Sequence, residues 1–567
     1  MNKITSKQLA VTILFSLIIL FGISLCIPAL DNIAIKYIEQ FFHKTLRNPA
    51  RWIDVIQNTS RLCIFTLCLI YFLLYLKKGI ELCGKIEARF AEIKSQYFCK
   101  KTAIIFSILS LSLFIVYFNI ITANYFYADD VFRNYGGNRS WIGFSRYISE
   151  FGSIIIHNSL KLNDIAPLTQ LISILIASGT IMIISLTLTE GLKVKNLTAL
   201  SLIFIAPFFA ENISYRFDCP YMALSLFFAA LPFLFKNDRI AFCFVSVISL
   251  LLTSFSYQAA LTLYILCVIY LFVMGLYSKK DFKENISFVL YAAGSFIIAM
   301  IIFKLFFMNK MSNSDDDYFS SAISLSAFIP NSLQYIKTTF ILNGGLLSKL
   351  LFLLAILLLV INTARTTKNK FASLILVAVT IVVSYILSFG PYLVFAKTVF
   401  AARAFMGFNV FLGLILLANL EIASNLTKKS FLPAFITYAT VYTCIIFMFT
   451  YGNCLKNQKD YENFRTKLIV HDLSEYSDKN TNYNISINGS IGLSQKSRIA
   501  LKNYPLISKM VPQRPTERHL WNEEVIGAYN FKCTDKHTEL TDDFILLKQT
   551  YYHDIYKSDN NYIVVLK

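Results

Sequence analysis

The sequence has little charge and lacks the motifs of a soluble, nucleotide-dependent enzyme. Only 15% of its 567 residues are charged, too few for the surface of a soluble domain of this length. It contains no phosphate-binding glycine loop, no dinucleotide fingerprint and no nucleophile elbow. Its 11 cysteines form no CxxC pair and no metal-ligand spacing, so no metal-binding residues are expected among them.

Long apolar runs fill most of the chain, in which 56% of the residues are hydrophobic. A helix needs about 20 apolar residues to cross a bilayer, whereas a membrane β-barrel would show short alternating segments instead. The sequence therefore predicts an all-α polytopic membrane protein with about thirteen transmembrane helices. The expected spans are residues 9–29, 61–77, 102–122, 165–188, 197–211, 219–235, 239–257, 259–277, 286–307, 345–363, 371–389, 402–420 and 431–452.

The basic residues predict the orientation of these spans. Lys and Arg gather in the loops at 77–101, 193–195, 236–239, 279–283, 365–370 and 428–429, which alternate so as to share one face, and such loops are cytoplasmic. An odd number of spans then places the N-terminus inside and the tail after residue 452 outside. The same loops account for most of the net charge of +19, so no nucleic-acid partner is implied.

Three regions follow from this pattern. Residues 1–100 form an N-terminal extension with two spans, 101–452 a transmembrane core, and 453–567 a small soluble α/β domain on the outer side. In this last region, alternating residues predict strands at 483–487, 544–547 and 562–566, and helical periodicity is present at 461–477 and 497–501.

The notable charges of the core gather on the outer face. Asp129 and Asp130 follow the third span; they are either solvated carboxylates or a general base with a neighbour that positions it. Glu211, Arg216 and Asp218 crowd a short connection, where an ion pair that joins two helices is one interpretation. The other is that Arg216, with Arg403 from a later loop, binds a phosphate, because guanidinium groups match phosphate oxygens.

Four stretches together resemble a known family. They are 127–130 (YADD), 163–170 (NDIAPLTQ), 207–218 (PFFAENISYRFD) and 402–408 (ARAFMGF). In order and spacing they are similar to the serotype-converting O-antigen glucosyltransferases of the type II family, over roughly residue 100 to the C-terminus. That resemblance implies a GT-C-like transmembrane catalytic domain at 101–452, in the bacterial inner membrane, with a periplasmic C-terminal domain.

The resemblance also implies a reaction. A hexosyltransferase of this kind takes glucose from undecaprenyl-phosphate glucose and attaches it, with inversion, to O-antigen units of lipopolysaccharide on the periplasmic face. Asp129 and Asp130 would be catalytic, and Glu211, Arg216, Asp218 and Arg403 would bind substrate. The family often has a Gly-Arg-Pro-like step after the acidic pair; its nearest match here is 138–140 (NRS), which adds Arg139 to the substrate-binding candidates.

The implied partners are lipid and glycan. They are the undecaprenyl-phosphate sugar donor, the O-antigen acceptor and membrane lipid, with a bactoprenol glucosyltransferase and a flippase in the same pathway. The sequence indicates no definite cofactor besides the lipid-linked donor, and paired carboxylates are compatible with a divalent metal. Two other functions stay open: a transporter or flippase of lipid-linked glycans, which would place ionisable residues deep in the bundle, and an O-antigen polymerase or ligase.

Overall fold

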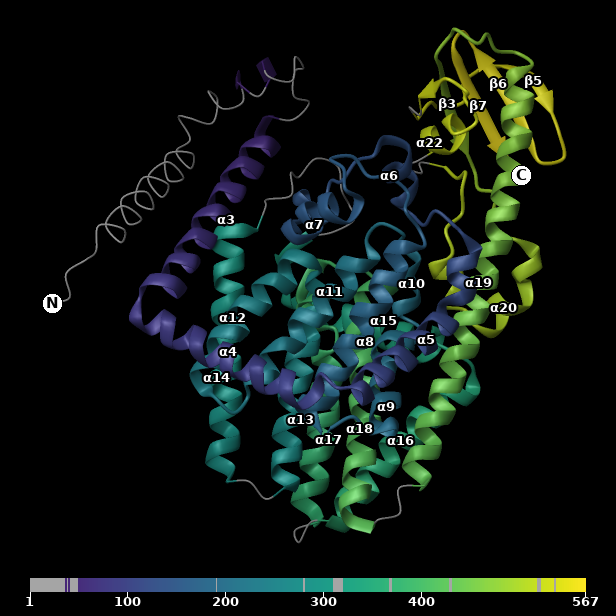
Figure 1. Cartoon of the computed structure of the whole chain (residues 1–567). Coiled ribbons are helices and arrows are strands. Elements are labelled where there is room, and N and C mark those ends of the chain that lie inside the picture. Colours follow the sequence, from purple (N-terminus) through teal and green to yellow (C-terminus); the bar gives the residue numbers. More distant parts are fainter. Residues whose placement is uncertain are drawn as a thin grey trace.

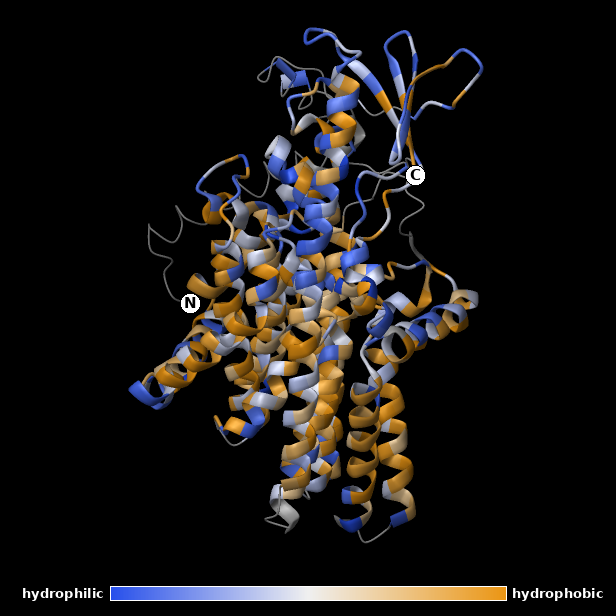
Figure 2. Cartoon of the chain, turned by 90° about the vertical axis from the view of Figure 1, so that its right-hand side faces the viewer, coloured by the Kyte–Doolittle hydropathy of each residue, from blue (hydrophilic) through white to orange (hydrophobic). Residues whose placement is uncertain are grey.

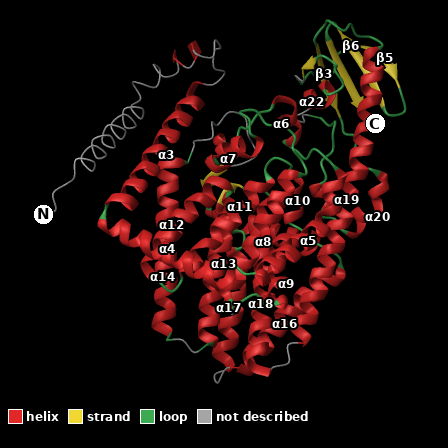
Figure 3. Ribbon diagram, in the orientation of Figure 1, coloured by secondary structure: helices red, strands yellow, loops and turns green. Residues whose placement is uncertain are grey.

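The structure is a computed structural model in which the protein is a helical bundle with a small sheet at one end (Figures 1 and 3). It describes residues 36–37, 39–40, 49–189, 191–278, 281–308, 320–366, 370–427, 431–517, 522–534 and 537–567. The expected first span, 9–29, lies outside the described residues.

Ten helical segments in these described ranges are long and apolar enough to cross a membrane. They comprise α3 (Pro49–Tyr75), α5 (Lys100–Ala123), α8 (Leu168–Leu188), α12 (Arg239–Ser256), α13 (Leu261–Tyr277), α14 (Phe282–Ile302), α16 (Leu346–Thr366), α17 (Lys370–Leu387), α18 (Met406–Thr427) and α19 (Phe431–Ser474). Figure 2 shows that apolar residues dominate them, whereas polar residues gather at the ends of the bundle and in the sheet. The expected helical bundle, with helices apolar enough to span a membrane, is therefore confirmed.

Twelve of the thirteen expected spans fall on helices, but two of these are short. The expected spans 197–211 and 219–235 correspond to α9 (Val194–Ile205) and to α11 (Cys219–Ala230), which η2 (Leu231–Phe235) continues. Both short helices are almost completely buried among the longer ones. The total of thirteen membrane crossings stays a prediction.

Shorter elements connect the long helices. The helical ones are α4 (Lys77–Tyr97), α6 (Asp130–Gly136), η1 (Ile142–Phe144), α7 (Tyr147–His157), α10 (Phe209–Ser214), η3 (Gln258–Ala260), η4 (Phe303–Phe307), η5 (Leu325–Ala327), α15 (Phe328–Ile336), η6 (Lys337–Leu342), η7 (Gly390–Val394) and η8 (Ala402–Phe405). Strands β1 (Ser320–Ile323) and β2 (Phe395–Lys397) form an antiparallel pair. Helices α6, α7 and α10 lie toward the end of the bundle that carries the C-terminal sheet (Figure 1), which we call the sheet-side end.

Helix α4 occupies the basic segment that the sequence analysis treats as a loop. Lys85 forms a 2.8 Å ion pair with Asp238, and the Arg89 side chain donates to the Leu234 carbonyl over 2.9 Å. The basic segment therefore lies against the connection between α11 and α12. The basic residues had predicted that these two segments share the cytoplasmic face.

Close helix packing at the centre of the bundle depends on small residues. Helix α19 runs along α5, and a Cβ atom at Gly452 would lie 2.6 Å from the backbone carbon of Asn119, closer than any side chain can approach. Helix α18 is buried on all sides along its apolar stretch, as expected of a helix that is hydrophobic all round. These contacts fix the position of α5, which ends at Ala123, just before the aspartates at 129 and 130.

The C-terminal region folds around the far half of α19. Along this half, Tyr461, Arg465, Ile469 and Leu473 recur every four residues and so share one face, which packs on the sheet. The strands are β3 (Tyr483–Asn488), β4 (Cys533–Thr534), β5 (Ile545–Gln549), β6 (His553–Ser558) and β7 (Asn561–Leu566), in the order β4-β3-β7-β6-β5.

The pairing makes this a mixed sheet. Strand β3 is parallel to β4 and β7, whereas β7, β6 and β5 are antiparallel. The accompanying helices are η9 (Gln495–Ser497), α20 (Arg498–Asn503), α21 (Ile507–Met510) and α22 (Asn522–Gly527). The predicted strands at 483–487, 544–547 and 562–566 are confirmed; β4 and β6 were not expected.

Candidate functional site

The two neighbouring aspartates have opposite environments. Helix α5 ends at Ala123, and the chain turns through Asn124, whose φ is 48°, into residues 124–130, which we call the acidic loop. The Asp129 side chain is exposed and makes no hydrogen bond or ion pair with the rest of the described chain. Asp130 is fully buried. Only Asp129 can therefore meet a substrate without a change in the loop.

Asp130 holds the acidic loop against the connection between α10 and α11. Its Oδ2 accepts hydrogen bonds from the backbone N–H groups of Tyr127 and Arg216, each 3.0 Å long, while its Oδ1 has no partner in the described part of the chain. Burial raises the pKa of the Asp130 carboxyl from 3.8 to about 8. The nearby Asp218 carboxylate also raises this pKa, whereas the two hydrogen bonds from backbone N–H groups lower it. Asp130 is therefore mainly neutral at pH 7.

This buried carboxyl should make the protein less stable as the pH rises. The folded protein keeps the Asp130 proton up to about pH 8, whereas the unfolded chain releases it near pH 3.8. Between these values the folded state binds more protons, so the free energy of unfolding falls with increasing pH. An Asp130→Asn variant should show a flatter decline when unfolding midpoints in detergent are compared from about pH 5 to about pH 8. Parallel declines in both proteins would contradict this assignment.

Three buried or half-buried ion pairs surround the loop. Arg216 pairs with Asp164 at 3.0 Å, Arg403 with Glu211 at 2.6 Å, and Arg133 with Asp218 at 3.1 Å. Glu211, Arg216 and Asp218 thus have partners elsewhere in the chain instead of one another. Each pair joins segments that are far apart in sequence, and the burial of these charges requires such partners.

Arg216 is fully engaged in this arrangement. Its guanidinium group contacts Asp164, donates to the Asn124 side chain and lies 4.4 Å from the centre of the Phe126 ring. Its own backbone N–H holds Asp130. Arg216 therefore fixes the acidic loop from both sides, and its charge is already neutralised by a carboxylate.

Arg139 lies in a separate pair with Glu150, at 3.1 Å. Glu150 also accepts hydrogen bonds of 3.0 and 3.2 Å from the backbone N–H groups of Trp141 and Ile142. This carboxylate therefore stabilises the conformation of the segment between α6 and α7. The Trp141 indole donates to Asp218 and stacks 4.0 Å from the Arg133 guanidinium group. Arg139 is thus tied to a structural carboxylate, and its role as a substrate ligand stays a prediction.

Arg146 is a cation that the sequence analysis missed. It is half-buried at the start of α7 and has no carboxylate partner among the described residues. Its Nε donates to Gln258 at 3.4 Å, and its guanidinium group lies 4.5 Å from the centre of the Tyr257 ring. Arg403 also acts electrostatically on Tyr257. Tyr257 is therefore in ring contact with Arg146 and within electrostatic reach of Arg403.

Aromatic contacts connect Arg403 to the acidic loop. The ring of Tyr215 lies 4.8 Å from that of Tyr127, and the Arg403 guanidinium group is 5.5 Å from the same Tyr215 ring. Asp129, Asp130, Glu211, Arg216, Asp218 and Arg403 thus belong to one cluster at the sheet-side end, as the sequence predicts. Among the described residues, the Asp129 carboxylate has no partner and no carboxylate neutralises the half-buried Arg146.

A comparison with protein families identifies the chain. The family model described as glucosyl transferase GtrII matches residues 118–414, which is more than half of the chain. The chain belongs to the glucosyl transferase GtrII family. The resemblance inferred from the four sequence stretches is thereby confirmed. The match includes every residue of the cluster but ends before α19, so the C-terminal sheet lies beyond it.

One relative of this GtrII family chain is an uncharacterized 55.3 kDa protein encoded in the gtrB 5' region of Salmonella phage P22. The two chains are 29% identical over 188 residues, which cover 32% of this chain and 38% of the phage protein. No solved structure matches the chain.

His157 has a structural position in this family member. Its Nδ1 is 2.8 Å from the carbonyl oxygen of Asn163, and its ring stacks on Phe217 with centroids 5.7 Å apart. Burial lowers the pKa of His157, which favours the neutral ring. It therefore holds the segment that presents Asp164 to Arg216.

Among the described residues, one group of His, Asp and Glu side chains has metal-ligand spacing, and it is remote from the acidic loop. It consists of His471, Asp472 and Glu475 near the end of α19. Lys548 already contacts both carboxylates, at 2.9 and 2.6 Å, and supplies the positive charge there. A divalent metal at the acidic pair stays a prediction from the sequence.

Proposed function

We propose that this protein is an inverting glycosyltransferase that moves glucose from undecaprenyl-phosphate glucose to O-antigen units at the periplasmic face of the inner membrane. Membership of the GtrII family carries the proposal, together with a carboxylate, Asp129, and a cation, Arg146, that have no charged partner in the described part of the chain. The positive-inside rule supports a periplasmic location for the sheet-side end, because the basic residues of the sequence gather in loops that are predicted to lie on the opposite face.

The chemistry needs a base and a cationic site for the leaving phosphate. Asp129 removes the proton from an acceptor hydroxyl as that oxygen attacks C1 of the donor glucose. The bond between C1 and the phosphate oxygen breaks on the opposite side, and its electrons leave with the lipid phosphate. Arg146 receives the resulting negative charge, and Arg403 contributes only if its pair with Glu211 opens as the phosphate arrives. The Asp130 side chain keeps the acidic loop in position by accepting hydrogen bonds from the backbone N–H groups of Tyr127 and Arg216.

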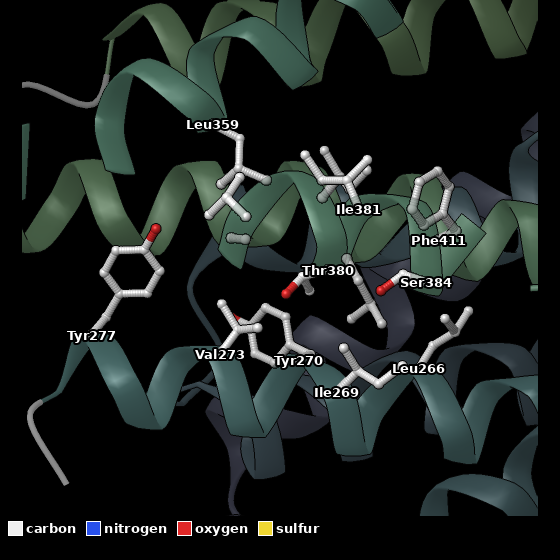
Figure 4. A pocket seen from close by; sticks show the side chains of 14 residues that line it. Leu266, Ile269, Tyr270, Val273, Tyr277, Leu359, Thr380, Ile381, Ser384 and Phe411 are labelled. Atoms are coloured by element: carbon white, nitrogen blue, oxygen red, sulfur yellow. The ribbon is translucent and has the colours of Figure 1, made fainter. Parts of the chain in front are cut away.

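An apolar pocket in the bundle has the chemistry to hold a prenyl chain. It lies between α13 and α17, with α16 and α18 closing its sides (Figure 4). Figure 4 shows Ile269, Tyr270 and Val273 of α13 facing Thr380 and Ile381 of α17. Helix α17 leads to η7 and then to Arg403 in η8. A prenyl tail along α17 would therefore bring its phosphate toward Arg403.

The test is transfer of labelled glucose from undecaprenyl-phosphate glucose to an O-antigen acceptor by the purified protein in lipid nanodiscs. Product formation that depends on both substrates supports the proposal. Without transfer from several polyprenyl-phosphate sugars, the proposal fails, and movement of the labelled lipid between the leaflets of a vesicle would favour a flippase instead.

Replacing Arg146 with alanine should weaken use of the donor. Loss of a charge-assisted contact to phosphate lowers kcat/KM for the donor by about 10- to 100-fold, while the KM for the acceptor stays nearly unchanged. Initial rates with each substrate varied in turn measure the two effects. Lys161→Ala, which removes an exposed charge on the same segment, is the matched control. Equal losses for donor and acceptor would exclude Arg146 from the phosphate site.

A further inference from the structure

The C-terminal region contacts the acidic loop directly. Arg514 donates from Nη2 to the carbonyl oxygen of Phe126 over 2.6 Å, and its guanidinium group lies 4.9 Å from the centre of the Tyr125 ring. The Tyr127 hydroxyl donates to the carbonyl oxygen of Met510. Three consecutive residues before Ala128 and Asp129 are thus held by a segment that lies about 380 positions later in the chain.

A buried carboxylate from α19 joins the two sides. The Glu462 carboxylate accepts a hydrogen bond from the Tyr125 hydroxyl, which lies 2.8 and 3.0 Å from its two oxygens. It also accepts a hydrogen bond of 3.2 Å from the backbone N–H of Arg514. The Arg514 guanidinium group approaches the same carboxylate to 3.4 Å. Both charged side chains are less than a tenth exposed, so water cannot easily take the place of either one as the partner of the other. The pair therefore depends on this specific geometry.

We propose that Arg514 is a positioning residue that sets the acidic loop for catalysis, which makes the C-terminal domain a part of the catalytic unit. The inference rests on the proposed function only for its effect on turnover. Arg514 lies outside the range matched by the family model. It acts through the backbone of Phe126, three residues before Asp129, and a displacement of about 1 Å at a catalytic group lowers turnover by about 100-fold.

Two further contacts support the same coupling. Lys459 of α19 donates to the carbonyl oxygen of Ala123, over 3.2 Å, at the point where α5 ends. Gly527 of α22 lies against Tyr135 of α6, because a Cβ at Gly527 would be 3.0 Å from the Tyr135 hydroxyl. The acidic loop is therefore held at its start, along its length and through the helix that follows it.

Hydrogen exchange tests the inference without relying on activity. In nanodiscs, the amides of residues 124–130 should exchange at least about tenfold faster in Arg514→Ala than in the wild type, while those of β3, β6 and β7 keep their protection. Lys509→Ala, which removes an exposed charge from the same segment, should leave both regions unchanged. Unchanged exchange in the loop, or equal acceleration in the sheet, would overturn the proposal.

Kinetics then test the link to turnover. Arg514→Ala should lower kcat by about 10- to 100-fold with little change in the donor KM, and Arg514→Lys should restore part of it because the ammonium group can still reach the Phe126 carbonyl. A loop that exchanges faster with an unchanged kcat overturns the positioning role. If the wild type transfers no sugar, the proposed function fails, while the exchange result still reports on the coupling.

Discussion

Replacing Asp129 with asparagine should lower glucose transfer by about 10²- to 10⁴-fold, the contribution expected of a general base. The change is almost isosteric, and the exposed side chain has no partner in the described chain to lose. The unfolding midpoint should therefore stay the same. Turnover at saturating donor and acceptor measures the effect, and size-exclusion behaviour of the detergent-solubilised protein shows whether the variant is intact.

Asp130→Asn is the matched comparison. Asparagine keeps an oxygen that can accept hydrogen bonds from the N–H groups of Tyr127 and Arg216. Its amide nitrogen takes the place of Oδ1, which has no partner within the described ranges. We expect this variant to retain transfer within about tenfold of the wild type. The reverse result, with loss in Asp130→Asn and activity in Asp129→Asn, would assign the base to Asp130 and require the loop to open.

The membrane architecture was predictable because hydrophobic length and basic loops are local properties of the sequence. Short helices were harder: α9 and α11 are surrounded by other helices, and burial inside the bundle gives them the same apolar character as a membrane span. Helix α4 was missed because its polar residues looked like a cytoplasmic loop. Strand β6 was missed because Asp554 and Lys557 interrupt its apolar pattern, and pairing with β5 and β7 overrides that local signal.

The candidate site was predictable as a set of positions but not as a set of contacts. Charges at the ends of spans marked Asp129, Asp130, Glu211 and Arg403, and these do cluster. Their partners depend on which helices lie side by side, so Arg133 and the Glu462–Arg514 pair carried no usable signal. Asp164 lay within a stretch that supported the resemblance, which was the one hint of its role. Arg146 was overlooked because only the structure shows that none of the described carboxylates pairs with it.

The pair of Glu211 and Arg403 should have the largest effect on stability. The Glu211 carboxylate in α10 accepts a 2.6 Å hydrogen bond from the Arg403 guanidinium group and a 2.7 Å hydrogen bond from the Arg403 backbone N–H. These two bonds join α10 to η8. The Glu211 side chain is only 5% exposed. In Arg403→Ala this carboxylate loses its counter-charge, which should cost about 3–5 kcal/mol of unfolding free energy.

A double-mutant cycle separates the pair from other effects of Arg403. Glu211→Gln alone should cost less than Arg403→Ala, because the half-buried arginine can still reach water. The double variant should be more stable than Arg403→Ala alone, with a coupling of about 2 kcal/mol, since glutamine does not need a cation. Unfolding of micellar protein by increasing SDS measures all four proteins. Lys85→Ala breaks an exposed pair of similar length, 2.8 Å, and should change stability little. Strictly additive costs at Glu211 and Arg403 would show that the two side chains stabilise the bundle independently.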